Sequence, residues 1–212
     1  MLVPTPAGEA RITLHPAAGE PRALLALGHG AGGGVEARDL AALAAALPGH
    51  GVGVALVEQP WRVAGRKVAP APKTLDAGWL PVIAELARPG LPLYLGGRSA
   101  GARVACRTAG ALGAAGVLAL AFPLHPPGRP EKSRADELLS TGCRTLVLQG
   151  TRDSFGTPAE YPELPDTHRL VEVPYGDHGF AVPKRAPVSQ QEALDVITAA
   201  VLDWLRPGSD QR

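Results

Sequence analysis

The chain has 212 residues, which is enough for one well-buried core and is in keeping with a single domain. Its 21 basic and 20 acidic residues leave a formal net charge of +1, so no global field favours nucleic acid or an anionic membrane as a partner. Two cysteines are too few for a disulfide framework, and no apolar run of about 18 residues is free of glycine, proline and charge.

Short apolar runs alternate with segments of helical periodicity along the chain. The apolar runs predict an edge strand at 10–14, followed by buried strands at 23–28, 52–58, 91–97, 116–122, 145–150 and 168–174. The helical pattern predicts helices at 39–47, 75–87, 100–111 and 190–205, with Pro81 expected to delay or kink the second of them.

Continuous apolar strands separated by helices indicate an α/β fold. We expect a mostly parallel central sheet of about six to seven strands, with helices on both faces and no cap domain. Residues 1–206 are predicted to form this one domain, and residues 207–212 a frayed tail. The N-terminus lacks a basic segment followed by an apolar one, so we expect no signal peptide and, by default, a cytoplasmic protein. Ligands of such sheets bind beyond the carboxyl ends of the strands.

The pattern G-x-S-x-G appears at residues 97–101, after a predicted strand and before a predicted helix. A sharp strand-to-helix turn lifts the Ser99 hydroxyl out of the sheet, and flanking glycines remove side chains that would clash there. The start of the helix also places the N–H of Ala100 near an oxyanion that forms at a substrate carbonyl. The motif therefore predicts Ser99 as a nucleophile.

A second glycine-rich segment, HGAGGG at residues 29–34, follows the strand at 23–28. The Ala31 N–H is predicted to pair with that of Ala100 in an oxyanion hole, and Gly30 and Gly32 are candidate substrate contacts because glycine lets a backbone approach a ligand closely. Two alternatives remain, a plain flexible turn and a phosphate-binding loop. The P-loop pattern is absent, but Glu58 at a strand end could serve a dinucleotide fold.

An acid and then a histidine are expected later in the chain order. Asp153 follows the strand at 145–150, and His178 lies in a glycine-flanked loop beyond the strand at 168–174. We predict that His178 is the general base and that Asp153 orients it. Asp177 competes for the role of the acid, but successive side chains in an extended loop usually diverge.

With these residues in place, the chain resembles the α/β-hydrolase superfamily. The segments HGAGGG, GGRSAGAR, FPLHPPGRPEK, GTRDSFG and GDHGF are similar to a lidless, dienelactone-hydrolase-like group, and most of all to the hydrolase-like domain shared by testis-expressed protein thirty and the third NSL-complex regulatory subunit. The resemblance spans about residues 24–205. It implies the triad Ser99, His178 and Asp153 and the oxyanion donors Ala31 and Ala100. Dienelactone hydrolase has cysteine where this chain has Ser99, so its substrate does not transfer.

Weaker signals surround these motifs. Arg98 precedes the nucleophile, and the segment 61–73 carries basic residues without an acidic one, which either forms a basic rim for an anionic substrate or is solvated loop charge. His125 follows a strand end and is another candidate substrate contact, or is held by the prolines around it. No CxxC, H-E-x-x-H or acidic cluster with ligand spacing occurs, so we expect neither metal nor cofactor.

These expectations favour a serine hydrolase that acts on small ester or thioester substrates through an acyl-enzyme. A non-catalytic binding or scaffold module on the same fold is the alternative, because a fold does not determine function. The sequence specifies neither the acyl group, nor the leaving group, nor the oligomeric state.

Overall fold

The computed structural model describes residues 1–206, and the predicted tail at 207–212 lies outside them. Its strands are β1 (Leu2–Thr5), β2 (Gly8–His15), β3 (Ala23–Gly28), β4 (Val52–Glu58), β5 (Leu93–Arg98), β6 (Gly116–Leu120), β7 (Thr145–Gly150) and β8 (His168–Val173). Its helices are α1 (Arg38–Ala46), α2 (Pro60–Val63), α3 (Pro72–Leu86), α4 (Ala100–Thr108), α5 (Ala135–Leu139) and α6 (Gln190–Trp204), with 3₁₀ turns η1 (Leu47–His50) and η2 (Pro158–Glu160).

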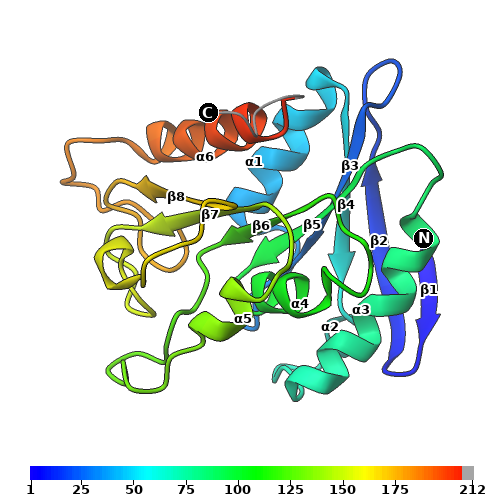
Figure 1. The fold of residues 1–212 in the computed structure, drawn as a ribbon, viewed down its shortest axis with the longest axis horizontal. Coiled ribbons are helices and arrows are strands. Elements are labelled where there is room, and N and C mark those ends of the chain that lie inside the picture. The colour runs from blue at the N-terminus through cyan, green and yellow to red at the C-terminus, as the bar shows by residue number, and fades with distance from the viewer. Residues whose placement is uncertain (207–212) are drawn as a thin grey trace.

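The strands form one eight-stranded sheet in the order β1-β2-β4-β3-β5-β6-β7-β8 (Figure 1). From β4 to β8 all neighbours run parallel, whereas β2 is antiparallel to β4 and β1 is antiparallel to β2. The predicted α/β-hydrolase fold class is confirmed, with a strand count slightly above the expected six to seven.

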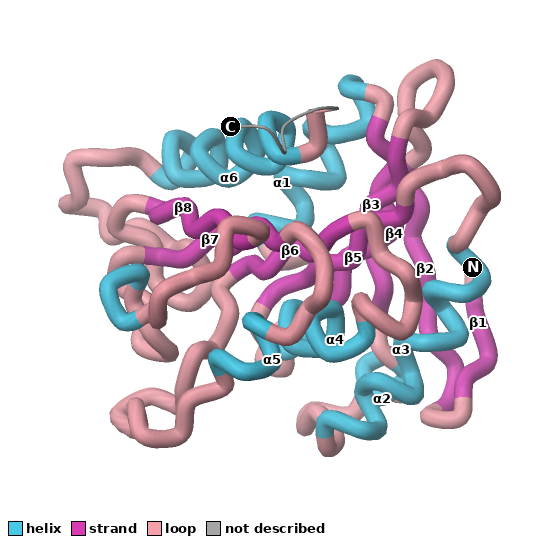
Figure 2. Tube along the Cα trace, in the orientation of Figure 1, coloured by secondary structure: helices cyan, strands magenta, loops and turns pink. Residues whose placement is uncertain are grey.

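Helices cover both faces of the sheet, with α1 and α6 on one side and α3, α4 and α5 on the other (Figure 2). Successive side chains of a buried strand point to opposite faces of the sheet, so each strand contributes to the core on both sides. In β6, for example, Leu118 and Leu120 pack toward α1 and α6, while Val117 and Ala119 pack into the opposite cluster. Because both sides of these strands are covered, their sequences are continuous apolar runs rather than alternating ones.

The strand that the sequence analysis missed is β1. It has four residues, of which Val3 is buried, and it contains Pro4 opposite Glu9. Proline cannot donate to a ladder and is tolerated only at an edge, and β1 is the edge of the sheet. A short strand with a proline has no apolar pattern that would distinguish it from a loop.

The second predicted helix starts earlier than expected. Helix α3 begins at Pro72, in the first turn, where the missing N–H of proline costs no intrahelical hydrogen bond. Pro81 lies inside the helix and does not delay its start. Leu75, Trp79 and Val82 are buried at helical spacing, so packing against the sheet outweighs the proline penalty.

Strand β3 lies between β4 and β5, so the chain adds β4 on one side of β3 and β5 on the other. The carboxyl ends of β3 and β5 are adjacent, with Gly28 paired in register with Gly97. This is the topological position where open α/β sheets bind ligands, and the HGAGGG and G-x-S-x-G segments both start there. In residues 1–206, no helix is both long enough and apolar enough to cross a membrane.

Candidate active site

Ser99 lies in a strained turn between β5 and α4. Its φ and ψ are 54° and −111°, which an L-residue rarely adopts, and α4 starts at the next residue, Ala100. The Ser99 N–H donates to the Leu120 carbonyl at 2.9 Å, which ties the turn to the neighbouring strand. This geometry lifts the side chain above the end of the sheet, as the motif predicts.

Two glycines allow β3, β5 and α4 to approach one another at this turn. A Cβ on Gly97 would lie 2.5 Å from the Gly28 carbonyl oxygen, and one on Gly101 would lie 2.4 Å from the same atom. Both distances are far below van der Waals contact, and the obstacle is backbone rather than a movable side chain. The glycines of the motif are therefore required by close approach.

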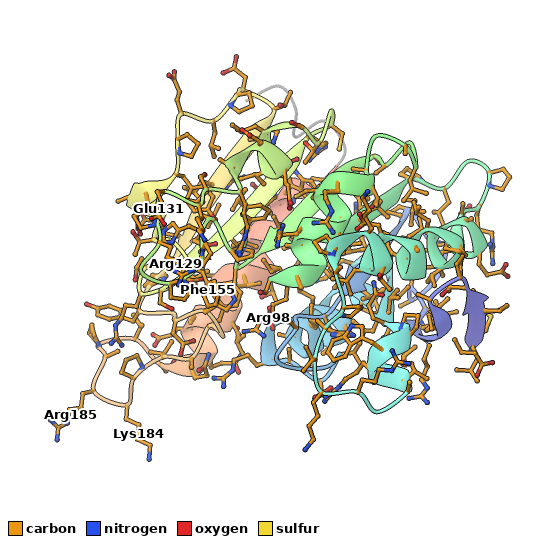
Figure 3. All side chains as sticks on the ribbon, turned by 90° about the horizontal axis from the view of Figure 1, so that it is seen from below. Arg98, Arg129, Glu131, Phe155, Lys184 and Arg185 are labelled. Atoms are coloured by element: carbon orange, nitrogen blue, oxygen red, sulfur yellow. The ribbon has the colours of Figure 1, made fainter. Side chains whose placement is uncertain are left out.

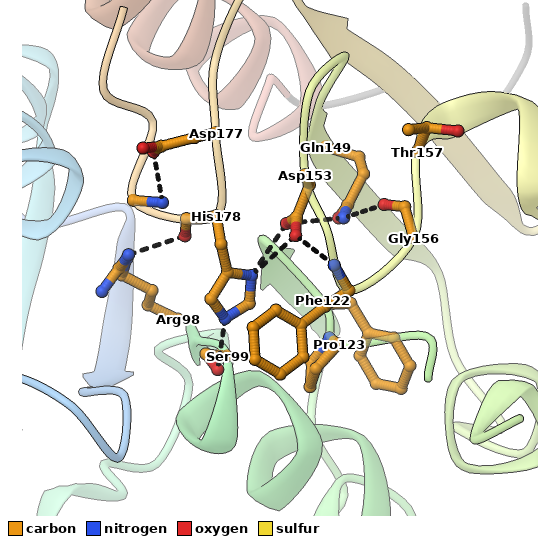
Figure 4. A network of polar contacts seen from close by, with 12 residues as sticks. Arg98, Ser99, Phe122, Pro123, Gln149, Asp153, Gly156, Thr157, Asp177 and His178 are labelled. Carbon is orange, nitrogen blue, oxygen red and sulfur yellow. Dashed lines mark hydrogen bonds and ion pairs between the residues drawn. The ribbon is translucent and has the colours of Figure 1, made fainter. Parts of the chain in front are cut away.

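The structure brings Ser99, His178 and Asp153 together from three loops at one edge of the sheet (Figure 4). His178 Nε2 lies 2.9 Å from Ser99 Oγ, and His178 Nδ1 lies 2.8 Å from Asp153 Oδ2. A carboxylate can only accept, so the matching tautomer donates from Nδ1–H to Asp153 and leaves Nε2 free to accept the Ser99 proton. The donor and acceptor roles in these hydrogen bonds suit a histidine base acting on a serine.

Asp153 is only 1% exposed, and protein donors compensate its burial. The Phe155 N–H donates to Oδ1 at 2.8 Å, and the Gln149 side-chain amide donates to Oδ2 at 2.9 Å. The Tyr161 hydroxyl in turn donates to Gln149 Oε1 at 2.8 Å, and burial, with the nearby Asp153 charge, raises the pKa of Tyr161 well above its usual value. The sequence analysis missed Gln149, although a glutamine inside an otherwise apolar buried strand is a usable signal for a buried polar contact.

The Phe155 ring stacks on the His178 imidazole, with ring centroids 4.1 Å apart and planes inclined by 26°. Figure 3 shows Phe155 and Arg98 within the body of the molecule, whereas Lys184 and Arg185 extend away from it. The phenyl ring covers one face of the imidazole and limits its rotation. Nothing in the sequence motif predicted this contact, because it depends on two loops from different strands.

Asp177, the competing acid, bonds to its own loop. Its Oδ1 accepts the N–H groups of Gly179 at 2.7 Å and Ala181 at 2.8 Å. These bonds shape the turn that carries His178, and the carboxylate faces away from the imidazole (Figure 4). The geometry therefore gives the two adjacent acidic candidates different environments.

Ala31 and Ala100 line one small pocket together with Gly30 and Gly101. Gly30 packs against the elbow, since a Cβ built on it would lie 3.4 Å from Ser99 Cβ. Ala100 is the first residue of α4, where a helix has N–H groups without intrahelical acceptors. Gly32 is exposed and has open space around it. Ala31 and Ala100 thus border the same space, and Gly30 connects its wall to the serine turn.

His29 fixes the loop behind this pocket. Its Nε2 accepts the Gln59 N–H at 3.0 Å, so the ring proton is on Nδ1, which faces the Gly30 carbonyl at 2.8 Å. Burial lowers the pKa of His29, which favours this neutral form. The residue therefore links the ends of β3 and β4.

The model of the alpha/beta hydrolase domain family matches residues 21–206 of the sequence. The chain belongs to this family. Among curated proteins, no sequence matches it.

Solved structures of α/β-hydrolases resemble this one over nearly the whole chain. An alpha-beta serine hydrolase homologue from Coxiella burnetii has a TM-score of 0.75 at 16% identity, covering 97% of this chain and 96% of that one. A lidless serine hydrolase from Xanthomonas campestris has a TM-score of 0.72 at 20% identity, covering 98% and 94%. A dienelactone hydrolase from Anabaena variabilis has a TM-score of 0.72 at 18% identity, covering 96% and 94%. At these identities the likeness concerns the fold.

Two predicted substrate contacts of this α/β-hydrolase chain are engaged by protein groups. Arg98 Nη2 donates to the His178 carbonyl at 2.6 Å, and Arg98 Nε lies 3.4 Å from the Asp39 carboxylate. His125 Nδ1 lies 2.9 Å from the Pro126 carbonyl, and its Nε2 lies 3.1 Å from the Glu160 carboxylate. Both partners of His125 are acceptors, and they raise its pKa, the Pro126 carbonyl most of all.

The basic segment at 61–73 meets the pocket through apolar residues. Trp61 is buried and lines the pocket with Ala69, and the Trp61 ring lies 5.6 Å from that of His29. Arg62 points toward Glu36, at 3.7 Å, on the exposed side. The segment therefore lines part of the pocket with apolar side chains, while its charged side chains lie toward solvent.

Proposed function

We propose that this protein is a serine hydrolase that cleaves small esters or thioesters through an acyl-enzyme. The observation that carries the proposal is the unbroken chain of contacts from Ser99 Oγ through both ring nitrogens of His178 to Asp153, at 2.9 and 2.8 Å. Membership in the α/β-hydrolase family and the lidless neighbours support it.

In the proposed mechanism, Ser99 Oγ attacks the substrate carbonyl while His178 Nε2 takes the hydroxyl proton. Asp153 holds the imidazole orientation and stabilises the imidazolium that forms. The carbonyl oxygen, now an oxyanion, accepts from the N–H groups of Ala31 and Ala100. Collapse of the tetrahedral intermediate transfers the proton from His178 to the leaving oxygen or sulfur. Water, deprotonated by His178, then cleaves the acyl-enzyme and releases the acid.

The shape of the pocket favours short acyl groups. The space bordered by Ala31, Ala100, Trp61 and Trp79 has room for about one water molecule. Removing a long acyl chain from water would stabilise its complex by about 0.8 kcal/mol for each buried methylene, but this requires a tunnel to cover the chain. We expect kcat/KM on p-nitrophenyl esters to peak between acetyl and butyryl. A steady rise out to dodecanoyl would contradict this.

Labelling with a fluorophosphonate probe tests the function itself and separates it from a non-catalytic scaffold role. We expect the probe to modify Ser99 in the wild type, and Ser99→Ala to abolish labelling while the melting temperature stays unchanged. On any ester that the protein turns over, Ser99→Ala should lower kcat by on the order of 10⁴–10⁶. A folded wild type that neither reacts with the probe nor hydrolyses any ester of the panel would refute the proposal.

We also propose a cytoplasmic location, supported by Cys106 and Cys143, which are both free thiols. The finer likeness to the domain of testis-expressed protein thirty and the NSL-complex subunit remains a prediction.

A further inference from the structure

One arginine connects the serine turn to the histidine loop. Arg98 is the last residue of β5 and precedes Ser99 directly, and its Nη2 donates to the main-chain carbonyl of His178 at 2.6 Å (Figure 4). The guanidinium also packs against the next residue of that loop, since a Cβ on Gly179 would lie 3.2 Å from Nη2. The histidine backbone is therefore bonded to the residue beside the nucleophile.

A buried carboxylate lies behind this arginine. Asp39, in the first turn of α1, is fully buried, and its Oδ2 lies 3.4 Å from Arg98 Nε. In residues 1–206, neither carboxylate oxygen of Asp39 has a hydrogen-bond partner. Burial raises the pKa of Asp39, while the Arg98 charge acts in the opposite direction. A fully buried carboxylate needs a compensating charge, and Arg98 supplies one.

We propose that Asp39 and Arg98 are positioning residues that hold the main chain of His178 at the distance from Ser99 that proton transfer requires. This inference rests on the function proposed above. A guanidinium is a planar fork with fixed donor directions, so an opposite charge beside Nε favours one orientation of Nη2. The contact of Nε with Asp39, within residues 1–206, is an ion pair at 3.4 Å rather than a hydrogen bond. Asp39 orients the guanidinium through this charge, Arg98 holds the carbonyl of His178, and the imidazole of His178 meets Ser99 Oγ. Proximity of this kind is sensitive to shifts of about 1 Å.

A purely structural ion pair is the competing explanation, and a double substitution separates the two. Arg98→Met alone leaves Asp39 buried without a counter-charge, so a lower activity could reflect lost stability. The double variant Asp39→Asn/Arg98→Met removes both charges and keeps the volumes similar. A structural pair predicts that this variant recovers both melting temperature and kcat. Positioning predicts that the melting temperature recovers while kcat stays low.

For the double variant we expect kcat to fall about 10–100-fold, as for the loss of a hydrogen bond from a charged group, with KM within about twofold of the wild type. Asp39→Asn alone, which keeps Arg98, should have a smaller effect on kcat. In the Arg98→Met background it should have no further effect on kcat, because Asp39 is argued to act through Arg98. Arg152→Met is the matched control. It removes an exposed arginine beside Asp153 and should leave kcat unchanged.

The rate of fluorophosphonate labelling and the proton NMR signal of the His178 Nδ1–H provide two further readouts. We expect the double variant to be labelled more slowly and this signal, assigned by its loss in His178→Gln, to shift or broaden. A wild type that is not labelled at Ser99 would overturn the proposed function and this inference with it. A labelled wild type whose double variant keeps wild-type kcat and labelling rate would overturn the positioning role alone.

Discussion

The serine side and the histidine side of the candidate site meet across 2.9 Å, yet they are built in different ways. The serine side is a single stretch of backbone. A Cβ added to Gly97 or Gly101 would lie only 2.5 or 2.4 Å from the Gly28 carbonyl oxygen. Between these glycines, Ser99 has a strained φ of 54°. Its geometry is specified by five consecutive residues and the strand next to them.

The histidine side is assembled from separate segments. The position of His178 depends on the Asp153 carboxylate after β7, the stacked ring of Phe155, the donor of Arg98 on β5 and the turn shaped by Asp177. These contacts join His178 to the loop after β7, to the end of β5 and to its own turn. The histidine side can therefore lose one contact and keep the others. In the serine turn, a side chain on either glycine would clash with the Gly28 backbone.

The difference predicts two kinds of mutational outcome. Substitutions of Gly97 and Gly101 in the serine turn should act on folding and activity together, because the same close packing determines both. Substitutions around His178 should produce a graded series of activities in folded proteins. Ranking variants from the two sides by both stability and kcat tests the comparison directly.

The largest graded effect is expected at the carboxylate that faces the imidazole. Asp153→Asn should lower kcat by about 10³–10⁴, because an amide favours the wrong imidazole tautomer and cannot stabilise the imidazolium. The matched substitution Asp177→Asn should cost less than about tenfold, since an amide oxygen can still accept from Gly179 and Ala181. Steady-state kinetics on one short ester decides between them. The reverse ranking would assign the acid to Asp177.

On the serine side, Gly101→Ala should lower the free energy of unfolding by about 3 kcal/mol or more, because the new methyl group overlaps the Gly28 carbonyl. Gly32→Ala is the control, since nothing lies within 4 Å of a Cβ at that position. It should change the free energy of unfolding by less than about 1 kcal/mol. Urea denaturation followed by circular dichroism measures both. A Gly101→Ala protein as stable as the wild type would show that the backbone around the serine turn can shift to accommodate a methyl group.

The same contrast explains what could be read from the sequence. The fold followed from apolar runs, and Ser99, Asp153 and His178 stood out because strand ends and chain order restrict where such residues can lie. Phe155 and Asp39 did not stand out, because their roles depend on contacts between segments far apart in the sequence that no local pattern encodes. Gln149 had only the weaker signal of a polar residue inside an apolar strand. The sequence indicated Arg98 by its charge as a candidate substrate contact, but only the structure shows that its donors face Asp39 and the His178 carbonyl.

The smallest expected effect concerns the support of the acid loop. The backbone N–H of His125 donates to the Phe155 carbonyl at 3.0 Å, and the His125 ring contacts Glu160. A titratable pair therefore braces the loop that carries Asp153. The Pro126 carbonyl and Glu160 raise the pKa of His125, while Thr157 donors and His125 lower that of Glu160. The pair gives this side of the site a pH dependence of stability.

The sign follows from the two pKa directions. A raised histidine pKa contributes stability that is complete below about pH 6.5, the ordinary value, and is lost as pH rises through the folded-state pKa. A lowered glutamate pKa contributes stability above about pH 4.3 that is lost as pH falls through its folded-state pKa.

The difference in free energy of unfolding between the wild type and His125→Asn should therefore be greatest between about pH 4.5 and 6.5 and should shrink toward pH 9. It should stay below about 1 kcal/mol, because the Glu160 side chain is 43% exposed and solvent screens the pair. His50→Asn, at an exposed histidine, controls for the loss of an imidazole. A wild-type advantage over His125→Asn that instead grew above pH 7 would mean that neutral His125 braces the loop, and that the ion pair with Glu160 does not.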